Sequence, residues 1–158
     1  MPKPGREGVA LAEDDIVSRV GHTMYQSNYE QVSPDQFRLS TPEKKADWKR
    51  ISVYECSSTS DKDIINLLRN KARKFIIKLK VGDVRYITID NSKPFDVKWD
   101  PREDCLDSNL NMIQGAEKGC DGHAGLEGLY PSNKADREER RVELAKYATE
   151  KGDFYLKS

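Results

Sequence analysis

Glycine spacing in residues 115–128 is the feature that most restricts how this chain can fold. Five of its ten glycines lie between Gly115 and Gly128, and those at 119, 122, 125 and 128 recur at every third position. A glycine inside a helix or a strand costs roughly 0.5–1 kcal/mol relative to alanine. The spacing therefore predicts a loop over residues 119–129, in which the backbone takes positive φ or approaches another group closely.

This loop contains the strongest candidate for a catalytic site. His123 lies between two acids, Asp121 and Glu127, and a carboxylate beside an imidazole orients it as a general base. Backbone N–H groups of glycine-rich loops also bind anions, which makes Gly119, Gly122 and Gly125 candidate ligand-binding residues. No established phosphate-loop pattern is present. A histidine that satisfies one hydrogen bond in a compact surface loop is the alternative.

Metal binding is a second hypothesis for the same region. Cys120-x-x-His123 has the spacing of a ligand pair, and a tetrahedral set could be completed by Cys105 with Asp100, Asp104 or Asp121. A structural zinc site normally has two such pairs, and the second pair is missing. We therefore predict no metal and no other cofactor.

Two arginines are further candidates for ligand binding. Arg38 follows a Ser-Pro turn, and Arg50 lies in a strand that also contains Ser52 and Glu55. Strand alternation places Arg50 and Ser52 on one face and Glu55 on the other, which counts against all three forming one site. Ordinary surface ion pairs are the alternative.

Hydrophobic periodicity predicts an α+β fold, a mostly antiparallel sheet of four to six strands with two main helices. Apolar alternation indicates strands at 48–55, 74–81, 84–89, 95–99 and, at an edge of the sheet, 154–156. Gly82-Asp83 has the chemistry of a hairpin turn between the second and third of these. Helical spacing indicates helices over 60–72 and 134–150, the latter capped by Asn133 and ended by Gly152. A short helix could also begin in residues 11–17.

Length and composition limit the organisation of the chain. Its 158 residues fit one domain, here 11–158, preceded by a flexible tail over residues 1–10. The 27 basic and 27 acidic residues cancel, so no net field favours nucleic acid or anionic lipid as a partner. No apolar run is long enough to span a membrane. Three cysteines, an odd number, favour a reducing, cytoplasmic location over a disulfide framework.

Six short motifs form a series that resembles a group of small uncharacterised bacterial proteins. They are Arg19-Val20, Val32-Ser33, Phe37-Arg38, Ile51-Ser52-Val53-Tyr54, Asp100-Pro101 and His123-Ala124. The group has an Arg-x-Val start, a Ser…Phe-Arg step, a Leu-Ser-Val-Tyr strand and a late His-Ala. This chain departs from it because Arg19 and Val20 are adjacent and Ile51 replaces the leucine. The resemblance spans residues 16–130 and implies a bacterial, cytoplasmic setting, without an activity.

Two functions from different classes fit the sequence. The first is a small intracellular protein-binding module, such as the accessory or immunity component of a bacterial gene pair, whose partner is another protein. The second is a small hydrolase or transferase for a phosphate-containing or acyl substrate, with His123 as general acid/base and Asp121 or Glu127 orienting it. A pocket around His123 with an arginine nearby would favour the enzyme. An exposed apolar patch would favour the binding module.

Overall fold

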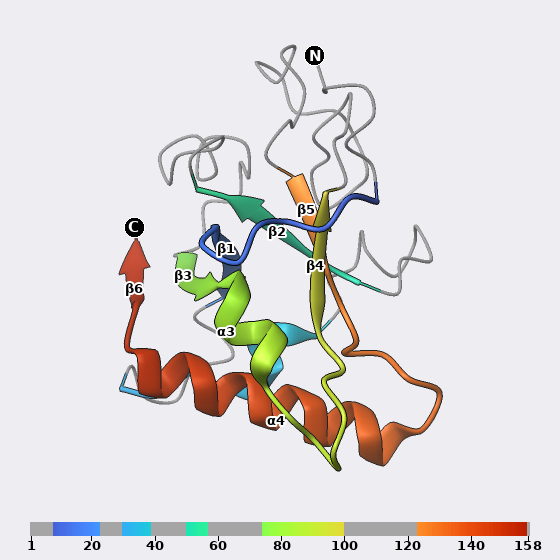
Figure 1. The fold of residues 1–158 in the computed structure, drawn as a ribbon. Coiled ribbons are helices and arrows are strands. Elements are labelled where there is room, and N and C mark those ends of the chain that lie inside the picture. Colours follow the sequence, from blue (N-terminus) through green and yellow to red (C-terminus); the bar gives the residue numbers. More distant parts are fainter. Residues whose placement is uncertain (1–7, 23–29, 39–49, 57–73, 100–122, 158) are drawn as a thin grey trace, which may run out of the picture.

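The computed structural model describes residues 8–22, 30–38, 50–56, 74–99 and 123–157. One antiparallel sheet has the order β4-β5-β2-β1-β3-β6, with strands β1 (Ile16–His22), β2 (Ile51–Glu55), β3 (Lys74–Lys80), β4 (Asp96–Trp99), β5 (His123–Glu127) and β6 (Phe154–Lys157). The other elements are the 3-10 helix η2 (Pro34–Phe37) and the helices α3 (Val81–Tyr86) and α4 (Lys134–Lys151). The predicted α+β fold is confirmed (Figure 1). The helix predicted over 60–72 lies outside the described residues.

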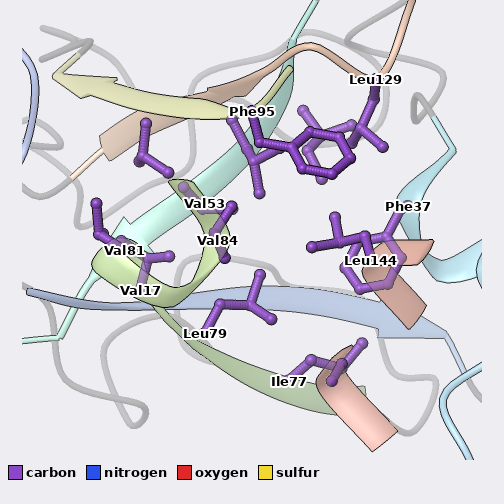
Figure 2. Close-up of a cluster of buried hydrophobic side chains, with 14 of the residues drawn as sticks. Val17, Phe37, Val53, Ile77, Leu79, Val81, Val84, Phe95, Leu129 and Leu144 are labelled. Carbon is purple, nitrogen blue, oxygen red and sulfur yellow. The ribbon is translucent and has the colours of Figure 1, made fainter. Parts of the chain in front are cut away.

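The hydrophobic core lies on one face of the sheet. Alternate residues of the strands point to this face and are fully buried: Val17 of β1, Ile51 and Val53 of β2, Ile77 and Leu79 of β3, Val97 of β4, and Ala124 and Leu126 of β5. Leu144, Ala145 and Ala148 of α4 and Phe37 of η2 belong to the same cluster. Figure 2 shows side chains from the sheet, η2, α3 and α4 converging there. We call this side of the sheet the core face and the opposite side the second face.

The predicted hairpin across Gly82-Asp83 is wrong, because residues 81–86 form helix α3. Val81 and Val84, one helical turn apart, are both fully buried, whereas Tyr86 is 60% exposed. The apolar spacing at this point therefore follows a helix and not a second strand. Backbone hydrogen bonds from Val81 N to Asp15 O (2.9 Å) and from Gly82 N to Glu13 O (2.8 Å) fix the start of the helix.

Helix α4 matches the helix predicted over residues 134–150. The side chain of Asn133 accepts a hydrogen bond from Asp136 N, and Gly152 has the left-handed conformation (φ 72°) at the C-terminal end. Both caps satisfy backbone groups that a helix leaves unpaired at its ends. Immediately afterwards the chain forms β6, which pairs with β3 at an edge of the sheet as predicted.

The N-terminal part of the described chain contributes a strand and not a helix. The short helix expected in residues 11–17 is absent there, since β1 begins at Ile16 and the preceding residues form a turn. Residues 8–11 run beside β4, with hydrogen bonds from Gly8 N to Trp99 O, Trp99 N to Val9 O and Leu11 N to Val97 O. Backbone pairing thus begins inside the segment expected to be a tail, and residues 1–7 lie outside the described part.

Candidate functional site

Residues 123–127, predicted as part of a glycine-rich loop, form strand β5 in the interior of the sheet. β5 pairs with β2 on one side and β4 on the other. Pairing on both sides engages the backbone of Gly125 in the sheet, opposite Ser52 and Lys98. An anion cradle made from glycine N–H groups is therefore not available at this position, because a paired strand directs these groups at its neighbours.

Register brings His123 and Ser52 together on the second face. His123 lies opposite Tyr54, and Ser52 lies opposite Gly125. The His123 Nε2 and Ser52 Oγ atoms are 3.0 Å apart, within hydrogen-bond distance. The Tyr54 ring meets the imidazole edge-on, with centroids 5.5 Å apart and an interplanar angle of 81°. His123 is only 4% exposed, so these contacts hold its ring in one orientation.

The Arg50 side chain crosses the same face over Gly125. A Cβ atom at residue 125 would collide with Cδ of Arg50, and it would lie 2.7 Å from Nε. A glycine is therefore needed here for the close approach of another side chain, and not for positive φ. Because Ser52 is the partner of Gly125, the Arg50 side chain passes beside the Ser52–His123 pair. We call these three residues the Arg50–Ser52–His123 cluster.

A buried arginine that sequence reasoning missed fixes the backbone of this cluster. Arg19 of β1 is 6% exposed and donates hydrogen bonds to the carbonyl oxygens of Ser52 (3.0 Å), Gln36 (3.0 Å) and Arg38 (2.8 Å). Its guanidinium thus ties β1 to β2 and to the end of η2. The sequence predicted no strand here, so the position of Arg19 on the core face, between Val17 and Gly21, follows only from β1.

The other predicted site residues lie elsewhere in the fold or outside the described residues. Glu127 is four residues along β5, about 13 Å from His123 at the rise of a strand, and its carboxylate pairs with Lys98 Nζ at 3.2 Å. Arg38 follows η2 on the core side and forms an ion pair with Asp35 at 2.6 Å, which raises the pKa of Arg38. Gly119, Asp121 and Gly122 lie outside the described residues.

Of the residues predicted as metal ligands, only His123 lies within the described part of the chain. Cys105, Cys120, Asp100, Asp104 and Asp121 all fall outside the described ranges. Within those ranges, no group of three or more His, Cys, Asp or Glu side chains could hold a metal ion. Cys56, which follows β2, places its Sγ atom 3.2 Å from Ser18 Oγ.

The Arg50–Ser52–His123 cluster contains the groups needed for proton transfer next to a cation. When Nε2 of His123 is unprotonated, it accepts a hydrogen bond from the Ser52 hydroxyl, as a general base does before it removes a proton. Arginine presents fixed N–H donors that match phosphate and carboxylate oxygens. A histidine that can move a proton and an arginine that can hold an anion therefore lie on the same face of the sheet.

Within the described residues, no helix has the length and apolar character needed to cross a membrane. No protein-family model, curated protein or solved structure matches the chain.

Proposed function

We propose that this protein is a small hydrolase or transferase that acts on a phosphate-containing or acyl substrate at the Arg50–Ser52–His123 cluster. The observation that supports it is the 3.0 Å approach of His123 Nε2 to Ser52 Oγ, with the Arg50 side chain passing beside them over Gly125. In this proposal His123 is the general acid/base, Ser52 the hydroxyl that it activates, and Arg50 the group that binds the substrate anion. The bacterial, cytoplasmic setting is part of the same proposal.

The protein-binding module ranks second because its expected surface is not found in the described part of the chain. The large exposed apolar side chains there are Val9, Tyr86 and Val142, which belong to the N-terminal segment, α3 and α4. These three side chains come from three separate elements, whereas a protein interface is marked by a contiguous apolar patch. A protein partner is therefore the competing outcome of the experiment below.

The first test measures hydrolysis of p-nitrophenyl phosphate and p-nitrophenyl acetate, which represent the two substrate classes. We expect one of them to be hydrolysed above background, with the rate lowered at least about 100-fold in Ser52→Ala and in His123→Gln, since a positioned acid/base contributes about 10²–10⁴-fold. Ser132→Ala is the matched control, because Ser132 is exposed ahead of α4. It should keep the wild-type rate.

A second experiment separates the enzyme from the binding module. Wild type and Ser52→Ala are used to capture ligands from native bacterial lysate, and native mass spectrometry identifies what each retains. A small anionic molecule held by wild type and lost from Ser52→Ala supports the site. If neither ester is hydrolysed and both proteins retain the same stoichiometric protein partner, the enzyme proposal fails.

A further inference from the structure

Lys98 of β4 is a second cation on the face of the sheet that carries the site proposed for catalysis. Its neighbour Val97 is fully buried on the core face, so Lys98 points to the second face, because successive residues of a strand alternate. Register places Lys98 opposite Gly125 on β5, and Gly125 opposite Ser52 on β2. These three residues therefore form one row across three strands, and the Arg50 side chain passes over the middle one.

An ion pair directs the ammonium group of Lys98 toward β5. Its Nζ lies 3.2 Å from Oε2 of Glu127, which is two residues beyond Gly125 on that strand. Leu126, between them, is fully buried on the core face, so Gly125 and Glu127 share the second face. The ion pair thus draws the ammonium toward the strand that Arg50 crosses.

This ion pair can be exchanged for a ligand. The side chains of Lys98 and Glu127 are 39% and 35% exposed, and an ion pair as exposed as this one contributes little to stability. An anion from solution can therefore replace the Glu127 carboxylate beside Lys98 Nζ at small cost.

We propose that the substrate of this site is a phosphate monoester, and that Lys98 selects it over a neutral acyl ester. The inference rests on the proposed function, since it concerns the substrate of the same site. Because β4 and β2 are about 10 Å apart, Lys98 and Arg50 approach the space above Gly125 from opposite sides. Two facing cations match the nearly two negative charges that a phosphate monoester carries at pH 7. A neutral acyl ester offers no charge for Lys98 to bind.

The pairing of β5 also favours a phosphate over an acyl substrate. Acyl transfer is commonly assisted by backbone N–H groups that stabilise an oxyanion. At Gly125 the strand is paired with β2 and with β4, which directs its backbone groups at those strands. Arg50 and Lys98 can instead stabilise charge with their side chains, as cations do on a phosphoryl group.

Three esters with the same p-nitrophenol leaving group test the selection by charge. The phosphate monoester is a dianion, bis(p-nitrophenyl) phosphate a monoanion, and the acetate neutral. After division by the uncatalysed rate of each ester, kcat/KM of wild type should fall in this order. Lys98→Gln should lower kcat/KM for the dianion by about 10–100-fold, mainly through KM, and at least about tenfold more than for the acetate.

Two further variants serve as controls for the loss of charge at Lys98. Lys98→Arg keeps the positive charge and should restore most of the activity toward the dianion. Lys146→Gln removes an exposed cation of α4 that pairs with Glu143, and it should match wild type for all three esters.

Isothermal titration calorimetry with inorganic phosphate tests the site without catalysis. Lys98→Gln should raise the Kd for phosphate at least about tenfold. Glu127→Gln should lower it, because the carboxylate no longer competes for Lys98 Nζ. If wild type does not bind phosphate, or if both variants bind it as wild type does, the ion pair is only structural and the inference fails.

The two measurements separate this inference from the proposed function. Phosphate bound through Lys98, without hydrolysis of any ester, would refute the enzyme and leave the anion site standing. Hydrolysis that Lys98→Gln lowers equally for all three esters, with unchanged phosphate affinity, would refute the choice of substrate and leave the enzyme standing.

Discussion

At the scale of single residues, Gly125 decides where the Arg50 side chain lies. Residue 125 lies opposite Ser52 in the β2–β5 pair, and its missing side chain leaves the space that Arg50 occupies. Any side chain at this position would push Arg50 away from Ser52 and His123. The absence of a Cβ atom at residue 125 therefore determines whether the Arg50 side chain can lie near Ser52 and His123.

Gly125→Ala should destabilise the protein by about 1–3 kcal/mol, because overpacking at a buried contact forces neighbouring groups to move. The free energy of unfolding from urea denaturation measures this loss. Arg50→Ala removes the group with which the new Cβ collides. In the double variant Arg50→Ala/Gly125→Ala, the alanine at residue 125 should therefore cost at least about 1 kcal/mol less than in the wild-type background. An equal cost in both backgrounds would show that Arg50 does not fill this space.

Arg19 shows why a site residue can be recognised only after its contacts are known. In the sequence it is one charged residue in a segment for which no strand was predicted, whereas in the fold it donates to three carbonyl oxygens from two other parts of the chain. Strand alternation indicates which face it takes, but not which acceptors are present there. The same holds for His123, whose hydrogen-bond partner Ser52 is 71 residues away in the sequence and is identified only in the fold.

At the scale of elements, Tyr147 joins α4 to α3 and β3. Its hydroxyl donates to Asp83 Oδ2 at 2.9 Å and accepts from Lys80 N at 3.3 Å. Burial, followed by the hydrogen bond and charge of Asp83, raises the pKa of Tyr147 from its ordinary value of 10 to about 12. The folded protein therefore holds the neutral phenol more strongly than the unfolded chain does.

This raised pKa predicts a stability change in alkaline solution. The stabilisation is fully present below pH 10, the ordinary pKa, and is lost as pH rises toward 12, because the unfolded chain releases this proton first. Tyr147→Phe should unfold more easily at neutral pH, by about 1–2 kcal/mol for the lost hydrogen bonds. Urea midpoints measured for both proteins between pH 8 and 11.5 should converge above pH 10. A gap that stays constant over this range would contradict the assignment.

At the scale of the whole molecule, the sheet is most extensively paired at β1 and β3. These two strands share seven residue pairs, and each has a second neighbour, β2 for β1 and β6 for β3. β6 pairs only with β3 among the described strands and ends the sheet. Local opening is easiest where the fewest contacts must break.

Native-state hydrogen exchange should therefore be slower in β1 and β3 than in β6. Amides of β1 and β3 that face each other should exchange slowest, near the rate set by global unfolding. Those of β6 should exchange at least about tenfold faster, equal to about 1.4 kcal/mol less opening free energy. Exchange resolved by mass spectrometry of peptides is sufficient to compare the strands. Equal protection of β6 and β1 would mean that the sheet opens only as one unit.

The sequence by itself determined the helices and strands whose hydrophobic pattern and capping residues match the structure that they adopt in the fold. Strand alternation predicted β2, β3 and β4, and the caps at Asn133 and Gly152 predicted α4 to within one residue, because these signals depend on neighbours along the chain. The α+β class followed from them.

Tertiary structure decided the features that depend on contacts between distant segments. Residues 81–86 form a helix because Val81 and Val84 both find space in the core, although alternation there resembled a strand. Glycine spacing predicted a loop at residues 123–127, but pairing on both sides satisfies the backbone of that segment and Arg50 fills the space at Gly125. Only the register of β5 against β2 places His123 beside Ser52, since neither residue specifies its cross-strand partner locally.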